Sequence, residues 1–264
     1  MIDFIKKLAR EAGEILLEGY GISQKEISHK GLIDLVTASD LKSEEFLTQE
    51  IKSRYPDDLV LAEERSYQIR DGNRIWIIDP LDGTTNFAHG FPFFAVSIAL
   101  EISSIINFGV VYNPYFKEMF WAEKGKGAFL NDQPIHVSAT SILRESLLAT
   151  GFPYDRWEKG EFYIKEYQAF MQRSQGVRRA GSASIDLCYL AAGRFDGFFE
   201  RKLKPWDTAA GSLIIDESGG SISQFSGSKW DCRDNSIIAS NGLIHEQMIK
   251  VLTELKHNRE GKIG

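Results

Sequence analysis

The sequence predicts an α+β fold, and two patterns along the chain support this prediction. Between residues 94 and 131, short apolar runs alternate with turn signals, which is typical of an antiparallel strand meander. From about residue 138 onward, strand patterns alternate with helix patterns. We therefore expect an α+β subdomain at residues 1–138 and an α/β subdomain at residues 139–264. No Pro- or Ser-rich linker separates them, so one compact unit is expected.

The composition is that of an ordinary globular protein. At 264 residues, the chain is long enough to bury a core without disulfides. Its net charge of −6 opposes non-specific binding to nucleic acid or anionic membranes, so we expect neither partner. The longest apolar stretch, Phe91–Leu100, is too short to span a bilayer. No signal peptide is visible and Cys188 is expected to be a buried free thiol, which favours a cytoplasmic location.

The N-terminal elements follow from periodicity and from end signals. Apolar residues recur at helical spacing over 2–19, and two glycines end that helix. The short apolar run Leu32–Thr37 precedes a second helix over 40–55, which Pro56 ends. The run Leu59–Ala62 then predicts a strand that leads into a pair of glutamates.

The segment DPLDGTTN is the most informative part of the chain. It follows the apolar run Ile75–Ile78, which predicts a buried strand that ends at Asp79 because Pro80 lacks a backbone donor. Gly83 permits a turn, and Thr84 stands where a following helix would begin. The segment thus places hard oxygen ligands beside the free amides of a helix N-terminus, which favours binding of Mg²⁺ and phosphate.

The remaining elements follow from the same signals. The meander is expected to contain the strands Phe94–Leu100, Phe108–Tyr112, Glu118–Ala122 and Ala128–Leu130. The C-terminal half is expected to contain strands at 147–150, 195–200 and 237–240, and helices at 162–171, 183–192, 206–217 and 243–255. The polar tail from His257 is expected to fray, and the five histidines are expected at surface or loop positions.

Acidic residues gather where strands end or helices begin, namely at Asp40, Glu63 with Glu64, Asp79 with Asp82, and Asp207. Each acid alone is more simply a helix cap or a solvated loop residue. Most of them, however, follow apolar runs that should be buried, and strand ends in one sheet converge on one edge. Carboxylates gathered there repel one another unless a cation neutralises them. The pattern therefore predicts a divalent metal site.

Five segments of the chain resemble the inositol monophosphatase family of Mg²⁺-dependent, lithium-sensitive phosphatases. They are DLVTASD (34–40), LAEE (61–64), WIIDPLDGTTNFAHGFPFFAVS (76–97), RRAGSASIDLCYLAAGRFDGFFE (178–200) and PWDTAAGSLIIDESGG (205–220). The resemblance covers nearly the whole chain. It implies a layered αβαβα sandwich of the inositol monophosphatase and sugar phosphatase type, usually assembled as a homodimer. It also implies two to three Mg²⁺ ions per subunit, with Mn²⁺ as a possible substitute.

The resemblance assigns metal ligands residue by residue. Glu63, Asp79 and the backbone carbonyl of Leu81 resemble one metal shell. Asp79, Asp82 and Asp207 resemble a second shell, in which Asp79 bridges the two ions. A third and weaker ion is expected near Glu63. Bound cations of this kind acidify a water molecule and neutralise phosphoryl oxygens, so the implied reaction is hydrolysis by metal-activated water.

The resemblance also assigns catalytic residues. Thr84 is similar to the residue that works with Asp40 to orient and deprotonate the attacking water. Glu63 is expected to be the third catalytic residue. The amides of Gly83 and Thr84 resemble a phosphate cradle, and Lys30 resembles a lysine near the metal-bound water. The implied substrate is a small phosphomonoester, most simply myo-inositol 1-phosphate.

Substrate contacts are implied for the hydroxyl groups of a polyol. The residues concerned are Asp82, Ser182, Ala183, Glu200 and Asp207. From the sequence alone, Glu200 is equally well interpreted as a surface acid at a strand end. Arg178 and Lys202 belong to two basic groups that flank these segments and could hold a second phosphate, although clustered charges are usually solvated. A second phosphate would suit fructose-1,6-bisphosphate hydrolysis, alone or together with inositol monophosphate hydrolysis. The resemblance leaves open one alternative of another class, a regulatory partner-binding protein with residual phosphatase activity.

Overall fold

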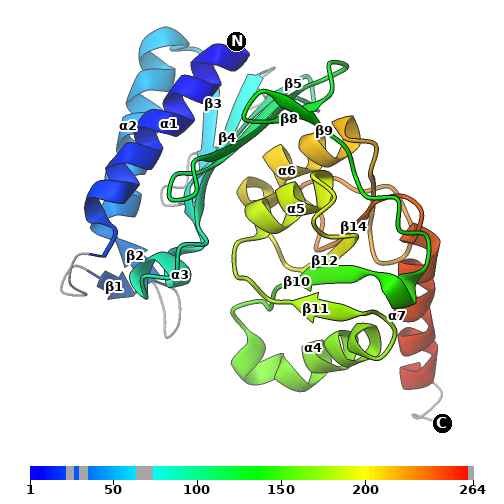
Figure 1. Ribbon diagram of the computed structural model, residues 1–264. Coiled ribbons are helices and arrows are strands. Elements are labelled where there is room, and N and C mark those ends of the chain that lie inside the picture. The colour runs from blue at the N-terminus through cyan, green and yellow to red at the C-terminus, as the bar shows by residue number, and fades with distance from the viewer. Residues whose placement is uncertain (22–26, 30–34, 64–73, 261–264) are drawn as a thin grey trace.

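A computed structural model of the chain describes residues 1–21, 27–29, 35–63 and 74–260 (Figure 1). Most strands belong to two sheets. The larger sheet has the order β3 (Leu59–Ala62), β4 (Arg74–Asp82), β5 (Ala95–Ile102), β6 (Ile105–Asn113), β7 (Glu118–Glu123), β8 (Ala128–Leu130) and β9 (Gln133–Ile135). The smaller sheet has the order β11 (Gly176–Arg178), β10 (Leu147–Thr150), β12 (Gly197–Arg201), β14 (Ser236–Ser240) and β13 (Ser221–Ser223). Separately, β1 (Ile27–His29) pairs with β2 (Leu35–Thr37).

The helices lie in three layers around the two sheets (Figure 1). The helices α1 (Ile2–Gly19) and α2 (Ala38–Arg54) pack on the outer face of the larger sheet, and α5 (Ala183–Ala191) and α6 (Pro205–Glu217) lie between the sheets. The helices α4 (Arg156–Met171) and α7 (His245–Glu260) cover the outer face of the smaller sheet, and α3 (Thr84–Ala88) is a short helix after β4. This arrangement confirms the layered αβαβα sandwich expected from the resemblance.

Each interface between layers buries apolar side chains at the spacing that the sequence predicts. In α1, Ile5, Leu8 and Leu16 are fully buried and belong to the same apolar cluster as Trp76 of β4. Helices α5 and α6 are apolar on most sides because sheets flank them on both faces. The predicted meander is confirmed, since β5, β6, β7 and β8 pair antiparallel in chain order.

The sequence predicted that the strand before the acidic turn ends at Asp79. This prediction is wrong, since β4 continues to Asp82. Its register with β5 shifts between Asp79 and Asp82, so Pro80 falls in an irregular part of the ladder where a missing donor costs little. The predicted turn at Gly83 is confirmed, with a φ of 90°. The helix α3 starts at Thr84, as expected.

Other boundaries also differ from the predictions. The helix α4 begins at Arg156 rather than 162, with a kink at Lys159, and α7 continues through the expected frayed tail to Glu260. The three-residue strands β9, β11 and β13 were not predicted, because each is too short to show a period. The division into subdomains at residue 138 stays a prediction: the two sheets lie on either side of it, but α6 packs on the larger sheet.

Two further predictions concern single residue types. Cys188 is a buried free thiol, as expected. The surface or loop position expected for the histidines is wrong for His245, which is buried at the start of α7 and bonds to the hydroxyls of Ser223 and Ser240 at 2.9 Å each. Within the part of the chain that the structure describes, no helix has the length and apolar content to cross a membrane.

Candidate active site

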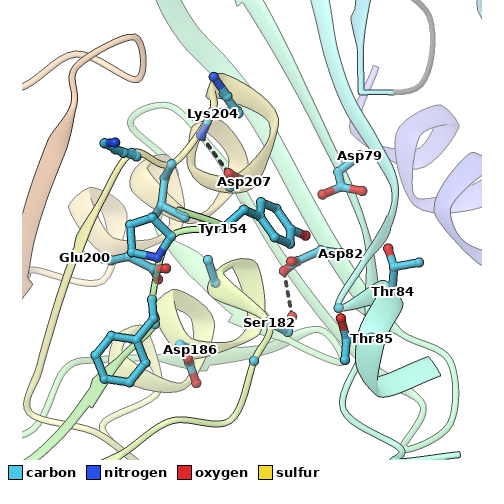
Figure 2. Close-up of a pocket in the computed structure, with 18 of the residues that line it drawn as sticks. Asp79, Asp82, Thr84, Thr85, Tyr154, Ser182, Asp186, Glu200, Lys204 and Asp207 are labelled. Atoms are coloured by element: carbon cyan, nitrogen blue, oxygen red, sulfur yellow. Dashed lines mark hydrogen bonds between the residues drawn. The ribbon is translucent and has the colours of Figure 1, made fainter. Parts of the chain in front are cut away.

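A cavity of about 340 Å³ lies where the end of β4 faces the starts of α5 and α6. Figure 2 shows side chains from these separate elements pointing toward one another, with Asp79 and Thr84 on one side and Glu200 on the other. The predicted residues that line it are Glu63, Asp79, Leu81, Asp82, Gly83, Thr84, Ser182, Ala183, Glu200, Lys202 and Asp207. The fold therefore brings nearly all of the predicted residues together.

Three carboxylates form the centre of the site. One carboxylate oxygen from each of Asp79, Asp82 and Asp207 lies within 4.8 Å of the other two. Burial raises the pKa of Asp79 well above its usual value, and the negative charges of Glu63, Asp82 and Asp207 raise it further. Burial also raises the pKa of Asp207, and the negative charges of Asp82 and Glu63 raise it further. A divalent cation would remove this repulsion.

The backbone around the cluster holds the carboxylates in place. The Asp79 Oδ1 atom accepts a hydrogen bond from the Leu81 amide at 2.9 Å, which closes the turn that contains Pro80. The Leu81 carbonyl accepts the Thr84 hydroxyl at 3.0 Å and keeps a second lone pair. The Asp207 Oδ2 atom caps α6 by accepting the Lys204 amide at 2.6 Å. Asp207 is thus both part of the N-terminal cap of α6 and a member of the carboxylate cluster.

The donor set fits the divalent ion that the sequence predicts. All the candidate ligands are oxygen atoms, which Mg²⁺ prefers, and several are carboxylates. Glu63 lies close enough for its charge to raise the pKa values of Asp79 and Asp207. The neighbouring Glu64 and Lys30 lie outside the described residues.

Asp82 differs from the other two aspartates because donors surround one of its oxygens. Its Oδ2 atom accepts the Ser182 hydroxyl at 2.6 Å, the Ser184 amide at 2.8 Å and the Ser184 hydroxyl (Figure 2 marks the Ser182 bond). Burial still raises the pKa of Asp82, against the lowering effect of these hydrogen bonds. The Ser182 hydroxyl, predicted to contact substrate, therefore already binds a carboxylate.

The two predicted catalytic residues Asp40 and Thr84 belong to different helices, α2 and α3. Asp40 is fully buried in the first turn of α2, and its negative charge contributes to the raised pKa of Asp79. Asp40 is not among the residues that line the cavity. The Thr84 hydroxyl donates to the Leu81 carbonyl. Cooperation between Thr84 and Asp40 in orienting water stays a prediction.

The far wall of the cavity carries Glu200. Its side chain is only 9% exposed, which answers the question that the sequence left open in favour of a buried wall residue. Burial raises the pKa of Glu200 to about 8, although the positive charge of Arg179 opposes the shift. The carboxylate lies over Gly151, where an added Cβ would come within 2.2 Å of it. Glu200 is therefore held against the loop after β10.

The two residues predicted to hold a second phosphate differ in position. Arg178 is exposed on the edge strand β11 and does not line the cavity, whereas the adjacent Arg179 does. Lys202 lines the cavity rim, where it forms an ion pair with Asp155, and this hydrogen bond raises the pKa of the lysine. Its charge is thus already partly compensated.

The sequence did not single out Ser184 or Asp186 for the site, whereas Arg179 belongs, with Arg178, to a basic group that could hold a second phosphate. Asp186 is 1% exposed in the first turn of α5, and burial followed by the charge of Glu200 raises its pKa well above the usual value. All three residues stand in the quoted segment RRAGSASID, so the signal was present. Ser184 bonds to Asp82, which lies 102 residues away in the sequence, so this contact could not be inferred from spacing.

Known proteins resemble this chain throughout its length. A model of the inositol monophosphatase family matches residues 1–257. The inositol-1-monophosphatase of Synechocystis sp. is 46% identical over 230 residues, 86% of this chain and 80% of that protein. The fructose-1,6-bisphosphatase/inositol-1-monophosphatase of Thermotoga maritima is 37% identical over 261 residues, 99% of each chain. The crystal structure of extragenic suppressor protein suhB from Bartonella henselae has a TM-score of 0.90 at 42% identity and covers 95% of this chain and 97% of that one.

Proposed function

The chain belongs to the inositol monophosphatase family, and we propose that its substrate is myo-inositol 1-phosphate, which it hydrolyses to inositol and phosphate. Family membership makes it a phosphoric monoester hydrolase. One observation carries the assignment of the site: the carboxylates of Asp79, Asp82 and Asp207 converge in a cavity that also contains the Gly83 turn. This combination suits a phosphate ester bound through divalent cations.

The residues around the cluster divide the work of phosphoryl transfer. Two to three Mg²⁺ ions, or Mn²⁺ in their place, would supply Lewis acidity and an acidified water when bound by Glu63, the Leu81 carbonyl and the three aspartates. The first amides of α3, at Gly83 and Thr84, have no acceptor within the helix and can donate to phosphoryl oxygens. Phosphoryl transfer needs such positioning more than it needs a protein nucleophile.

Substrate hydroxyl groups are proposed to lie against the far wall. Burial raises the pKa of Glu200 to about 8 and so favours its protonated form in the metal-free protein, and a protonated carboxyl can both donate and accept hydrogen bonds with a hydroxyl group. Ala183 begins α5 beside it, and Ser182 and Asp82 complete the wall. This arrangement supports a small polyol as the leaving group.

Substitution of Asp207 tests the metal assignment. Asp207→Asn removes one negative charge and keeps an oxygen that can accept the Lys204 amide, so the fold should persist. We expect turnover of myo-inositol 1-phosphate to fall at least about 100-fold, because metal-ligand contacts are lost. Phosphate release and circular dichroism measure the two effects. Near-native turnover by this variant would contradict the metal assignment.

A bisphosphate is the second candidate substrate, and a similar protein from Thermotoga maritima carries both activities in its name. Arg179 at the cavity and Lys202 at its rim supply positive charge for a second phosphate, whereas Arg178 is exposed and does not line the cavity. Turnover of fructose 1,6-bisphosphate and of myo-inositol 1-phosphate, measured in the Lys202→Ala and Arg178→Ala variants, tests whether either side chain binds a second phosphate. A second-phosphate contact should reduce turnover of the bisphosphate alone. Equal losses on both substrates would argue against a second phosphate site.

Assembly, location and inhibition complete the proposal. We propose a cytoplasmic homodimer that lithium inhibits. Phe91, in the loop before β5, and Trp157, in the first turn of α4, are 52% and 78% exposed and offer apolar surface for a second copy. Light scattering on the purified protein measures the mass, and a monomer at all concentrations would contradict the dimer. A pull-down that recovers only this chain would argue against a regulatory partner.

A further inference from the structure

The carboxylate of Asp82, at the end of β4, also caps the N-terminus of α5, the helix that lies between the two sheets. It reaches from the end of β4 to the start of α5, where its Oδ2 atom accepts the Ser184 amide at 2.8 Å and the Ser184 hydroxyl. The N-cap residue of α5, Ser182, makes no capping bond within its own helix and donates instead to the same Oδ2 atom at 2.6 Å. One oxygen of Asp82 thus receives three hydrogen bonds.

We propose that Ser184 is a positioning residue that fixes the direction in which Asp82 presents its other oxygen, Oδ1, to the carboxylate cluster. A carboxylate oxygen has about two lone pairs, so three donors saturate Oδ2 and leave Oδ1 as the ligand atom. Hydrogen bonds to a buried charged carboxylate are short and strong, and the positive end of α5 adds to them. Asp82 would therefore offer a metal ion one oxygen in a fixed orientation.

Hydrogen bonds from Asn86 hold the loop that precedes Ser182 and Ser184. The Asn86 side-chain amide, in α3, donates to the carbonyls of Phe93 at 2.7 Å, Ala180 at 2.9 Å and Gly181 at 3.3 Å. Asn86 thereby ties the loop before α5 to the turn that contains Asp82. Ser184 is completely buried, so neither water nor another side chain can readily replace its hydroxyl.

This inference rests on the metal-dependent activity proposed above, and metal titration separates the two. Calorimetry with Mn²⁺ alone, in the absence of substrate, reports binding directly. If the unaltered protein binds no Mn²⁺, the proposed function itself fails. If it binds Mn²⁺ and removal of the Ser184 hydroxyl leaves the dissociation constant unchanged, only the role of Ser184 fails.

A matched pair of substitutions isolates the hydroxyl. Ser184→Thr keeps the hydroxyl and Ser184→Val replaces it by a methyl group of the same shape, so any packing strain is common to both. We expect the Val variant to bind Mn²⁺ about tenfold more weakly than the Thr variant, the usual scale for residues that orient metal ligands. Equal dissociation constants for the pair would overturn the proposal.

Two further measurements distinguish positioning from a purely structural role. At saturating Mg²⁺, the Val variant should retain the KM of the Thr variant for myo-inositol 1-phosphate, while the Mg²⁺ concentration needed for half activation rises about tenfold. Ser218→Ala is the control, since the hydroxyl of this buried serine donates to the Ile215 carbonyl of its own helix at 2.9 Å and lies at the far end of α6 from Asp207. A similar loss of Mn²⁺ affinity in the control would attribute the effect to general destabilisation.

Discussion

At the scale of single residues, Glu200 shows how burial changes the chemistry of a carboxyl group. Its pKa is raised to about 8 mainly by burial, so in the metal-free protein the folded state favours the protonated form. The stabilisation that follows is complete below the ordinary glutamate pKa. It is lost as the pH rises through the folded value.

Glu200→Gln should therefore change the pH dependence of stability. With metal removed by a chelator, we expect the Gln variant to be more stable than the unaltered protein at pH 9, by an amount on the order of a few kcal/mol. The difference should shrink toward pH 5, where Glu200 is protonated in the folded protein. Urea unfolding at several pH values measures it. Parallel stability curves would show that the Glu200 carboxyl is not perturbed.

At the scale of elements, the turn between β4 and α3 depends on one glycine. Gly83 has a φ of 90°, and a Cβ added there would lie 2.8 Å from the Phe93 carbonyl oxygen and 3.3 Å from that of Gly181. The backbone approaches so closely because the amides of the turn must lie beside Asp82. A side chain at this position would move the turn away from the carboxylates.

Gly83→Ala should therefore cost both stability and turnover. We expect a loss of roughly 2–4 kcal/mol in unfolding free energy, since positive φ and a steric clash add together. Gly90→Ala is the matched control, because Gly90 has a φ of 71° but no atom within 4 Å of the added Cβ. Chemical denaturation of both variants separates conformational strain from the clash. Equal losses in the two would contradict close packing at Gly83.

Elements whose apolar residues repeat at a clear period could be predicted from the sequence, whereas irregular and very short elements could not. The helix α1 and the meander strands were predicted because their apolar residues repeat over several turns or pairs. The continuation of β4 past Pro80 was not, because a bulge is set by pairing with β5 rather than by local propensity. The acids of the site were selected because motifs mark them, whereas Ser184 was not, because its partner Asp82 lies 102 residues away.

At the scale of the whole molecule, the site joins parts of the chain that belong to different layers. Asp79 and Asp82 come from the larger sheet, and Asp207 comes from a helix between the two sheets. Packing these layers against each other forces like charges together, which raises the pKa values of Asp79 and Asp207. Without a cation, the acid cluster therefore opposes the close packing of the apolar layers.

Divalent metal should consequently stabilise the whole fold. Mg²⁺ at about 100-fold above its dissociation constant is expected to add about 2.7 kcal/mol, which raises the Tm by roughly 5–10 °C. Asp207→Asn should lose most of this increase and should melt higher than the unaltered protein when both are metal-free, because one buried negative charge is gone. Asp216→Asn, an exposed change on the same helix, should keep the full increase. Calorimetric melting with Mg²⁺ and with chelator measures all three, and an undiminished increase for Asp207→Asn would place the ion elsewhere.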